Sequence, residues 1–263
     1  GALDADIKSL KKAARQNVAP EILRRINLIL KCNDFELNED FKIYWNKYPI
    51  AKLCPGKDYL NPEIELIIDD MIEFTEQKDL KDYLVKWLSN KITIELESLF
   101  KLKSIKESNS LVRALSYQLY ENYGVVKREK VGSLMKKLTQ EDRKSLRNIG
   151  VKFGRYHIFL FKLFKPKQVS LRVLLWKNFK QINLSLKPPT FGLNFTDNSK
   201  FQNKDFMLLC GFEKFDRFFV RIDILERLFI HIIKNNLENN QEVKLVPEML
   251  NLLGCNKENF IKL

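Results

Sequence analysis

Positive charge is concentrated in one segment of this chain, and this limits how the chain can fold more than any other feature of its sequence. Residues 127–187 carry 17 Lys and Arg against three Asp and Glu, and no acidic residue lies between Asp142 and Asp197. The preceding part has 19 basic and 20 acidic residues, and the following part has 10 of each. Because burying an unpaired cation is costly, most of these cations must lie at the surface, unless the acidic stretch 57–82 packs against them.

Apolar residues recur at helical spacing through most of the chain. The repeat is clearest in residues 77–102, where apolar side chains are three and four positions apart and the opposite face is charged. Capping and turn residues set the ends of further predicted helices. These are two helices within 3–32, the second from Pro20, and single helices near 108–122, 128–138, 140–148, 166–180, 203–209, 222–234, 246–253 and 257–263.

Shorter stretches have the pattern of strands or turns. Residues 34–68 predict a small β-hairpin or meander, because apolar side chains alternate along them and Pro-Gly follows, with 64–68 as a third strand. A second hairpin is predicted across 212–220. Residues 182–200 and 235–242 are polar or rich in turn formers and are predicted to be connections.

Together these elements predict a mainly α fold with small β-elements, of the α+β class. Charge and turns divide the chain into three predicted parts. Residues 1–76 form helices and the meander, 77–187 form a helical part that is strongly basic in its second half, and 188–263 form a helix, hairpin and helix module. A winged-helix-like arrangement is one way to pack this last module. Its strand order differs from the commonest version, which leaves that arrangement open.

Several classes of chemistry lack their residues here. The chain has two histidines and four widely separated cysteines, so it offers no zinc-ligand pattern, and free thiols of a cytoplasmic protein are expected. It contains no phosphate-binding loop of the Gly-x-x-x-x-Gly-Lys-Ser/Thr type and no nucleophile elbow. No apolar run approaches the roughly 18 residues that span a bilayer. We therefore predict no catalytic residue, metal, cofactor or membrane partner for this chain.

The basic segment interleaves cations with aromatic residues, a pattern typical of proteins that bind single-stranded nucleic acid. Cations pair with phosphates and exposed rings stack on bases. Most of the aromatic residues have helical spacing and are expected in the core, which leaves Tyr156, and secondarily Phe153, for stacking. The predicted phosphate contacts are Lys152, Arg155, Lys162, Lys165, Lys167, Arg172 and Lys177.

Residues 149–166 read IGVKFGRYHIFLFKLFKP, which resembles a signature of a family of bacterial superfamily-two helicases related to the mitochondrial Suv-type RNA helicases. The resemblance runs from about residue 41 to the end and is strongest at 111–176 and 206–254. The family usually has proline where this chain has Phe161, which leaves the backbone course there open. Three more stretches agree in order and spacing, at 41–56, 210–228 and 246–260.

The resemblance implies a long parent protein, in which two RecA-like motor domains hydrolyse ATP with magnesium and an extended C-terminal region follows. This chain would be part of that region, without the motors and without their ATP-binding residues. Its expected role is a non-catalytic accessory region that binds RNA or DNA, single-stranded rather than duplex, beside its own motor domains. The alternative is a docking scaffold that joins the helicase to a nuclease or a ribosome-associated protein.

Overall fold

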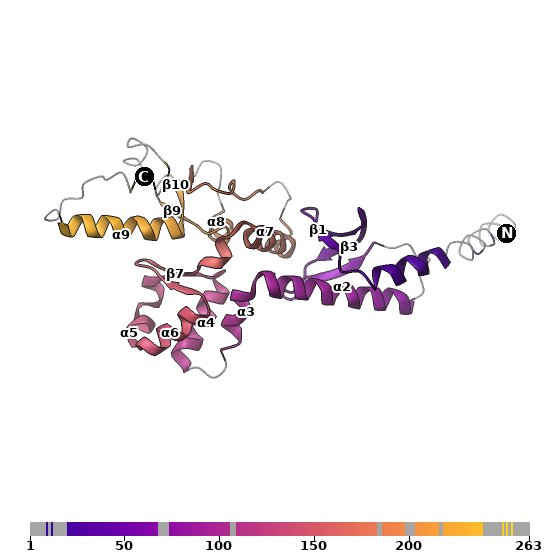
Figure 1. Ribbon diagram of the computed structural model, residues 1–263, viewed down its shortest axis with the longest axis horizontal. Helices are drawn as coiled ribbons and strands as arrows, with labels where there is room; N and C mark the ends of the chain where they lie inside the picture. The colour runs from indigo at the N-terminus through magenta and orange to yellow at the C-terminus, as the bar shows by residue number, and fades with distance from the viewer. Residues whose placement is uncertain are drawn as a thin grey trace. The chain divides into compact units, whose positions relative to one another are not determined.

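The computed structural model describes residues 20–67, 74–105, 109–182, 186–197, 203–215 and 218–238, together with Ser9, Lys12, Met249, Asn251 and Gly254. Within these residues the chain is an α+β protein, as predicted, with helices and three small antiparallel sheets (Figure 1). It divides into two compact units. One comprises residues 1–92 and 174–186, and the other comprises 93–173 and 187–263. The three parts predicted from the sequence stay a prediction as folding units.

Ten strands are described, and all of them are short. They are β1 Phe35–Leu37, β2 Lys42–Trp45, β3 Tyr48–Cys54, β4 Glu63–Leu66, β5 Val125–Lys127, β6 Val151–Phe153, β7 His157–Leu160, β8 Phe195–Asp197, β9 Phe212–Phe215 and β10 Phe218–Arg221. The helices after residues 20–29, which are helical, are α2 Phe74–Glu95, α3 Glu97–Lys103, α4 Ser110–Glu121, α5 Gly132–Lys137, α6 Gln140–Asn148, α7 Pro166–Lys180, α8 Lys204–Leu209 and α9 Ile222–Glu238, with 3-10 turns η1 Arg128–Val131 and η2 Phe161–Phe164.

The first unit is built on an antiparallel meander in the order β1-β2-β3-β4, which confirms the predicted β region at 34–68 and adds a fourth strand. Helix α2 packs beside it, where the ring of Phe35 meets the rings of Tyr83 and Trp87 edge to face. The Tyr83 hydroxyl donates to the carbonyl of Cys32 at 2.7 Å. Asn178, late in α7, donates to the carbonyl of Cys54 at 3.0 Å, so this end of α7 belongs to the same unit.

The prediction of one long helix over 77–102 is wrong in one respect, because the helix is interrupted at Leu96. The backbone of Leu96 has φ −107° and ψ 28°, outside the helical range, and α3 starts after it. Leu96 and Leu99 are both fully buried. The apolar residues thus stay in phase across the break, and a periodic pattern alone does not reveal it.

Helices of the second unit begin where capping residues predict. Asn109 caps α4, since its side chain accepts from the amide of Val112, and Thr139 forms a capping box with Asp142 before α6. After α4 the chain turns through Gly124 at φ +83°, a conformation that glycine adopts at little cost. The predicted helices at 108–122, 140–148 and 166–180 are confirmed.

The sheet of β5, β7 and β6, in that order, was not predicted from the sequence. All four residues of β7 are buried. A strand buried on both faces has no polar and apolar alternation, so a short apolar run of this kind does not distinguish strand from helix. After β7 the backbone enters the 3-10 turn η2 at Phe161. This is the backbone course that the replacement of the family's usual proline by Phe161 had left open.

The third sheet has the order β8-β10-β9 and confirms the predicted hairpin across 212–220. Strand β8 was missed because it lies in a turn-rich stretch. Helix α9 packs on this sheet through Val220, Ile224 and Leu225. It runs to Glu238, so residues 235–238, which were predicted as part of a loop, are helical. The helices predicted at 246–253 and 257–263 lie almost wholly outside the described residues, and the winged-helix arrangement stays a prediction.

Candidate nucleic-acid interface

The loop between β6 and β7 carries Gly154, Arg155 and Tyr156, and hydrogen bonds within the turn and from η1 and α9 anchor it. The amide of Gly154 donates to the carbonyl of His157 at 2.8 Å and closes the turn. Arg128 holds it from η1, because its guanidinium donates to the Gly154 carbonyl at 2.9 Å and its amide donates to the Tyr156 carbonyl at 2.7 Å. The turn therefore presents the two side chains at its tip from a fixed backbone.

Glu226, from α9, binds the same turn from its other side. Its carboxylate accepts from the backbone amides of Arg155, of Tyr156 at 2.9 Å and of His157 at 2.7 Å. Charge-assisted hydrogen bonds of this kind are about twice as strong as neutral ones. Glycine at 154 makes the approach possible, since a Cβ there would lie 2.4 Å from a carboxylate oxygen of Glu226.

His157 is buried between two carboxylates below the turn. Its Nδ1 lies 2.8 Å from Glu226 and its Nε2 lies 3.4 Å from Glu213, which also pairs with Lys127 at 2.9 Å. Burial lowers the pKa of His157, but the hydrogen bonds with Glu213 and Glu226 outweigh it, so the pKa is raised. Burial likewise raises the pKa of each glutamate, and the hydrogen bonds with His157 more than reverse this, so both pKa values are lowered.

These shifts predict how stability depends on pH. The raised pKa of His157 contributes stability that is complete below the ordinary histidine pKa of about 6.5 and is lost as pH rises through the folded value. The lowered pKa values of Glu213 and Glu226 contribute stability above about pH 4.3 that is lost as pH falls. The cluster is thus most stabilising between these limits.

The measurement is urea denaturation of the chain and of a His157→Gln variant, whose amide keeps hydrogen-bonding groups but does not titrate. We expect the difference in unfolding free energy between them to be larger near about pH 6 than near about pH 9. His231→Gln is the control, since it replaces the other histidine of the chain. An equal difference at both pH values would show that folding does not shift the pKa of His157.

A cavity of about 490 Å³ opens beside this turn, a size that suits a nucleotide-sized group. Tyr156 is 49% exposed, and its ring packs on Phe229 with centroids 4.2 Å apart. The lining thus combines cations, an exposed aromatic ring and the rim of the His157 cluster. The lining residues are Lys127, Arg128, Glu129, Arg155, Tyr156, His157, Glu213, Lys214, Leu225 and Phe229.

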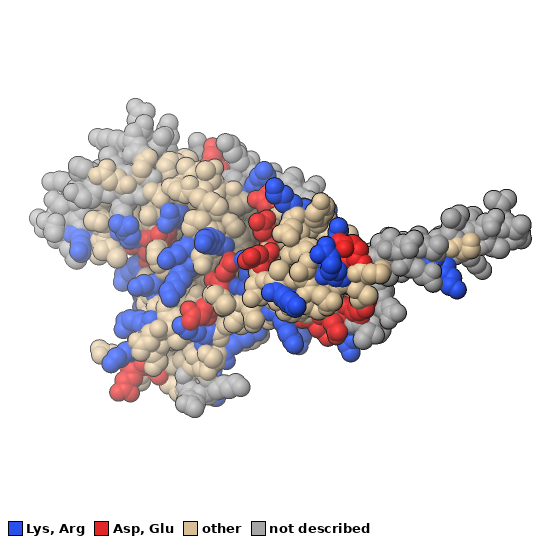
Figure 2. Space-filling model, turned by 45° about the vertical axis from the view of Figure 1, so that its right-hand side comes forward, with Lys and Arg blue, Asp and Glu red and all other residues tan. Residues whose placement is uncertain are grey.

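Five of the seven predicted phosphate contacts lie at the surface, but only Arg155 lines this cavity. The exposed residues are Lys152, Arg155, Lys162, Lys165 and Lys167. In Figure 2 the Lys and Arg side chains crowd the left part of the view, where Figure 1 places α5, α6 and β7. Phe153, the second stacking candidate, is half-buried and has the guanidinium of Arg147 5.5 Å from the centre of its ring.

The structure corrects the prediction for Arg172 and Lys177, which are buried. Arg172 is fully buried, and its guanidinium donates to the carbonyls of Tyr123, Leu163 and Leu209, each at 2.8 Å. It joins three segments of the second unit and cannot reach a phosphate. Lys177 is 7% exposed, which also removes it from any surface that nucleic acid could contact. Residues 171–173 and 175–178 of α7 are all buried, so the helix is enclosed nearly all round, which the charge count alone could not identify.

Sequence reasoning missed several cavity residues, because they come from segments far apart in the chain. Lys127 and Arg128 lie within the predicted basic segment but were not singled out. Lys214 and Phe229 lie outside it, on β9 and α9. The only available signal was the predicted hairpin and helix around them, which did not say that they would meet the tip at Tyr156.

Within the residues that the structure describes, no group of three His, Cys, Asp or Glu is placed to hold a metal ion. The described helices include none with the length and apolar character needed to cross a membrane. No family model, curated protein or solved structure matches this chain.

Proposed function

We propose that this chain binds single-stranded RNA or DNA as a non-catalytic accessory region of an ATP-dependent helicase. The observation that carries the proposal is the cavity at the tip of the β6–β7 hairpin, whose lining includes Lys127, Arg128, Arg155 and the half-exposed Tyr156. Cations pair with phosphates, while the ring offers a face on which a base stacks regardless of its sequence. The anchored backbone of the turn keeps these groups in place before a ligand arrives.

Surface charge supports the same proposal. Among the described residues, none forms an ion pair with Lys152, Arg155, Lys165 or Lys167. Their charge is therefore not neutralised by a described carboxylate and can attract a polyanion. In this proposal ATP and magnesium belong to the motor domains of the parent protein, the tail works beside them in the cytoplasm, and a nuclease or ribosome-associated partner is an additional proposal.

Binding to labelled single-stranded and duplex RNA and DNA, measured across a salt series, tests the proposal. We expect a triple reversal, Arg155→Glu, Lys162→Glu and Lys165→Glu, to weaken single-strand binding by about 100-fold or more at low salt. Each lost phosphate contact should flatten the plot of log affinity against log salt by about 0.7, so the triple variant should lose a slope of about 2.

The matched control reverses three exposed cations of the first unit, Lys31→Glu, Lys78→Glu and Lys86→Glu, which changes the net charge by the same amount. Equal losses of single-strand affinity in both triple variants would mean that binding depends on net charge and not on this surface. If the folded chain bound no nucleic acid even at low salt, the proposal would be abandoned in favour of the protein-docking scaffold.

A further inference from the structure

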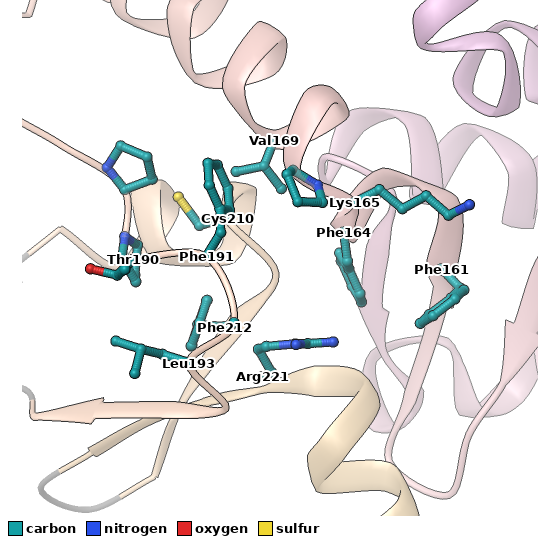
Figure 3. A pocket seen from close by; sticks show the side chains of 14 residues that line it. Phe161, Phe164, Lys165, Val169, Thr190, Phe191, Leu193, Cys210, Phe212 and Arg221 are labelled. Carbon is teal, nitrogen blue, oxygen red and sulfur yellow. The ribbon is translucent and has the colours of Figure 1, made fainter. Parts of the chain in front are cut away.

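A second, more apolar cavity of about 170 Å³ lies in the same unit (Figure 3). Phe161 and Phe164 of η2 lie on one side of it, and Phe191 and Leu193 lie on the other, with Arg221 between them. Phe161 is 40% exposed and Phe191 is 48% exposed. Exposed apolar rings that line the same cavity often mark a binding site.

The walls of this cavity are fixed by their own contacts. Phe164 stacks on Phe159, with ring centroids 5.5 Å apart and planes 12° from parallel. Arg221 donates to both carboxylate oxygens of Asp223, at 3.1 and 2.7 Å, which holds its guanidinium in place. On the opposite wall Pro188 and Pro189 restrict the backbone of the loop that carries Phe191. The cavity is therefore formed before a ligand enters.

Size and charge indicate what can occupy it. Ligand cavities commonly measure about 300–1,000 Å³, so this one accommodates a single ring or side chain and not a whole nucleotide. The described lining has no acidic residue, and Lys165 lies at the rim with its side chain exposed. Lys162 is also exposed, one residue after Phe161. An apolar, aromatic-walled cavity bordered by cations fits a ring that is attached to phosphates.

We infer that this cavity holds one unpaired nucleobase of a bound single strand, with the adjoining phosphate on Lys165. The inference rests on the proposed function and makes it more specific, because a base within a duplex cannot leave its partner to enter the cavity without cost. The chain then selects single strands through two aromatic sites, one at Tyr156 and one in the cavity that Phe161 and Phe191 line.

The test uses the whole chain and fluorescein-labelled single strands and duplexes of about twelve nucleotides, a length within the range that such proteins cover. A Phe161→Ala, Phe191→Ala double variant is expected to bind the single strand about 5- to 150-fold more weakly, with an unchanged salt slope and unchanged duplex binding. Tyr117→Ala is the matched control, because Tyr117 is 62% exposed on α4 of the same unit. Circular dichroism and thermal melting verify that each variant is folded.

Phe161→Trp separates a stacking role from a structural one, since it keeps an aromatic face. If Phe161→Trp binds the single strand with an affinity close to that of the unmodified chain, the inference is supported. If it loses as much affinity as the single Phe161→Ala variant, the inference is contradicted. If the double variant binds single strands normally while the Arg155, Lys162 and Lys165 reversal abolishes binding, the base site is wrong and the proposed function stands. The cavity would then suit an apolar side chain of a protein partner. If the unmodified chain binds no nucleic acid, both fail together.

Discussion

Replacing Arg172 by methionine is expected to lower the free energy of unfolding by about 3 kcal/mol or more. The guanidinium is fully buried and donates to the carbonyls of Tyr123, Leu163 and Leu209. Methionine fills similar space but donates nothing, so up to three buried carbonyls lose a hydrogen bond, and each unmet group costs about 1–3 kcal/mol. Urea denaturation followed by circular dichroism measures the loss.

Lys167→Met is the control for this prediction, because it makes the same chemical change at an exposed position of the same helix. It should change the unfolding free energy by less than about 0.5 kcal/mol. The loss of unfolding free energy for Arg172→Lys should fall between those of Arg172→Met and Lys167→Met, since an ammonium cannot match the planar guanidinium that reaches three carbonyls. If Arg172→Met unfolded at the same urea concentration as the unmodified chain, the buried hydrogen bonds would not be stabilising the unit.

Arg172 also shows why charge in a sequence locates a basic surface only approximately. Counting cations predicted that most of the segment is exposed, and most of its Lys and Arg are. The count assumed that a buried cation needs an acidic partner nearby. Arg172 instead uses carbonyls at the ends of segments, and these partners carry no signal in the sequence because every residue has a carbonyl group.

Elements with a strong local signal were predictable, and those that depend on distant partners were not. The caps at Asn109 and Thr139 act within three residues, so the helices that they start were located closely. Strand β8 exists because it pairs with β10, more than twenty residues later. Phe195 and Thr196 favour strands, but so short a run among turn-forming residues gives no clear signal in the sequence. The candidate site follows the same rule. Arg155 and Tyr156 were predicted from their local pattern, whereas Glu226 and Phe229 reach them from α9, about seventy residues later.

Glu226→Ala is expected to destabilise the second unit by about 3–5 kcal/mol and to free the tip of the β6–β7 hairpin. Three backbone amides and the imidazole of His157 would lose their acceptor at once. Denaturation measures the loss in stability, and hydrogen exchange of the amides of Arg155 and Tyr156 reports whether the turn opens. Arg227→Ala, at the neighbouring exposed position of α9, is the control and should have little effect.

A double-mutant cycle with Gly154→Ala shows whether Glu226 acts through this contact. In the unmodified chain a Cβ at 154 would lie 2.4 Å from a Glu226 carboxylate oxygen, so alanine there must displace a group held by three amides, at a cost of about 1–3 kcal/mol. Once Glu226 is alanine that obstacle is gone, and Gly154→Ala should cost much less. We expect a coupling between the two positions of at least about 1 kcal/mol. Additive losses would mean that the carboxylate does not bind the turn as closely as the structure has it, and the fixed presentation of Arg155 and Tyr156 to a nucleic acid would lose its physical basis.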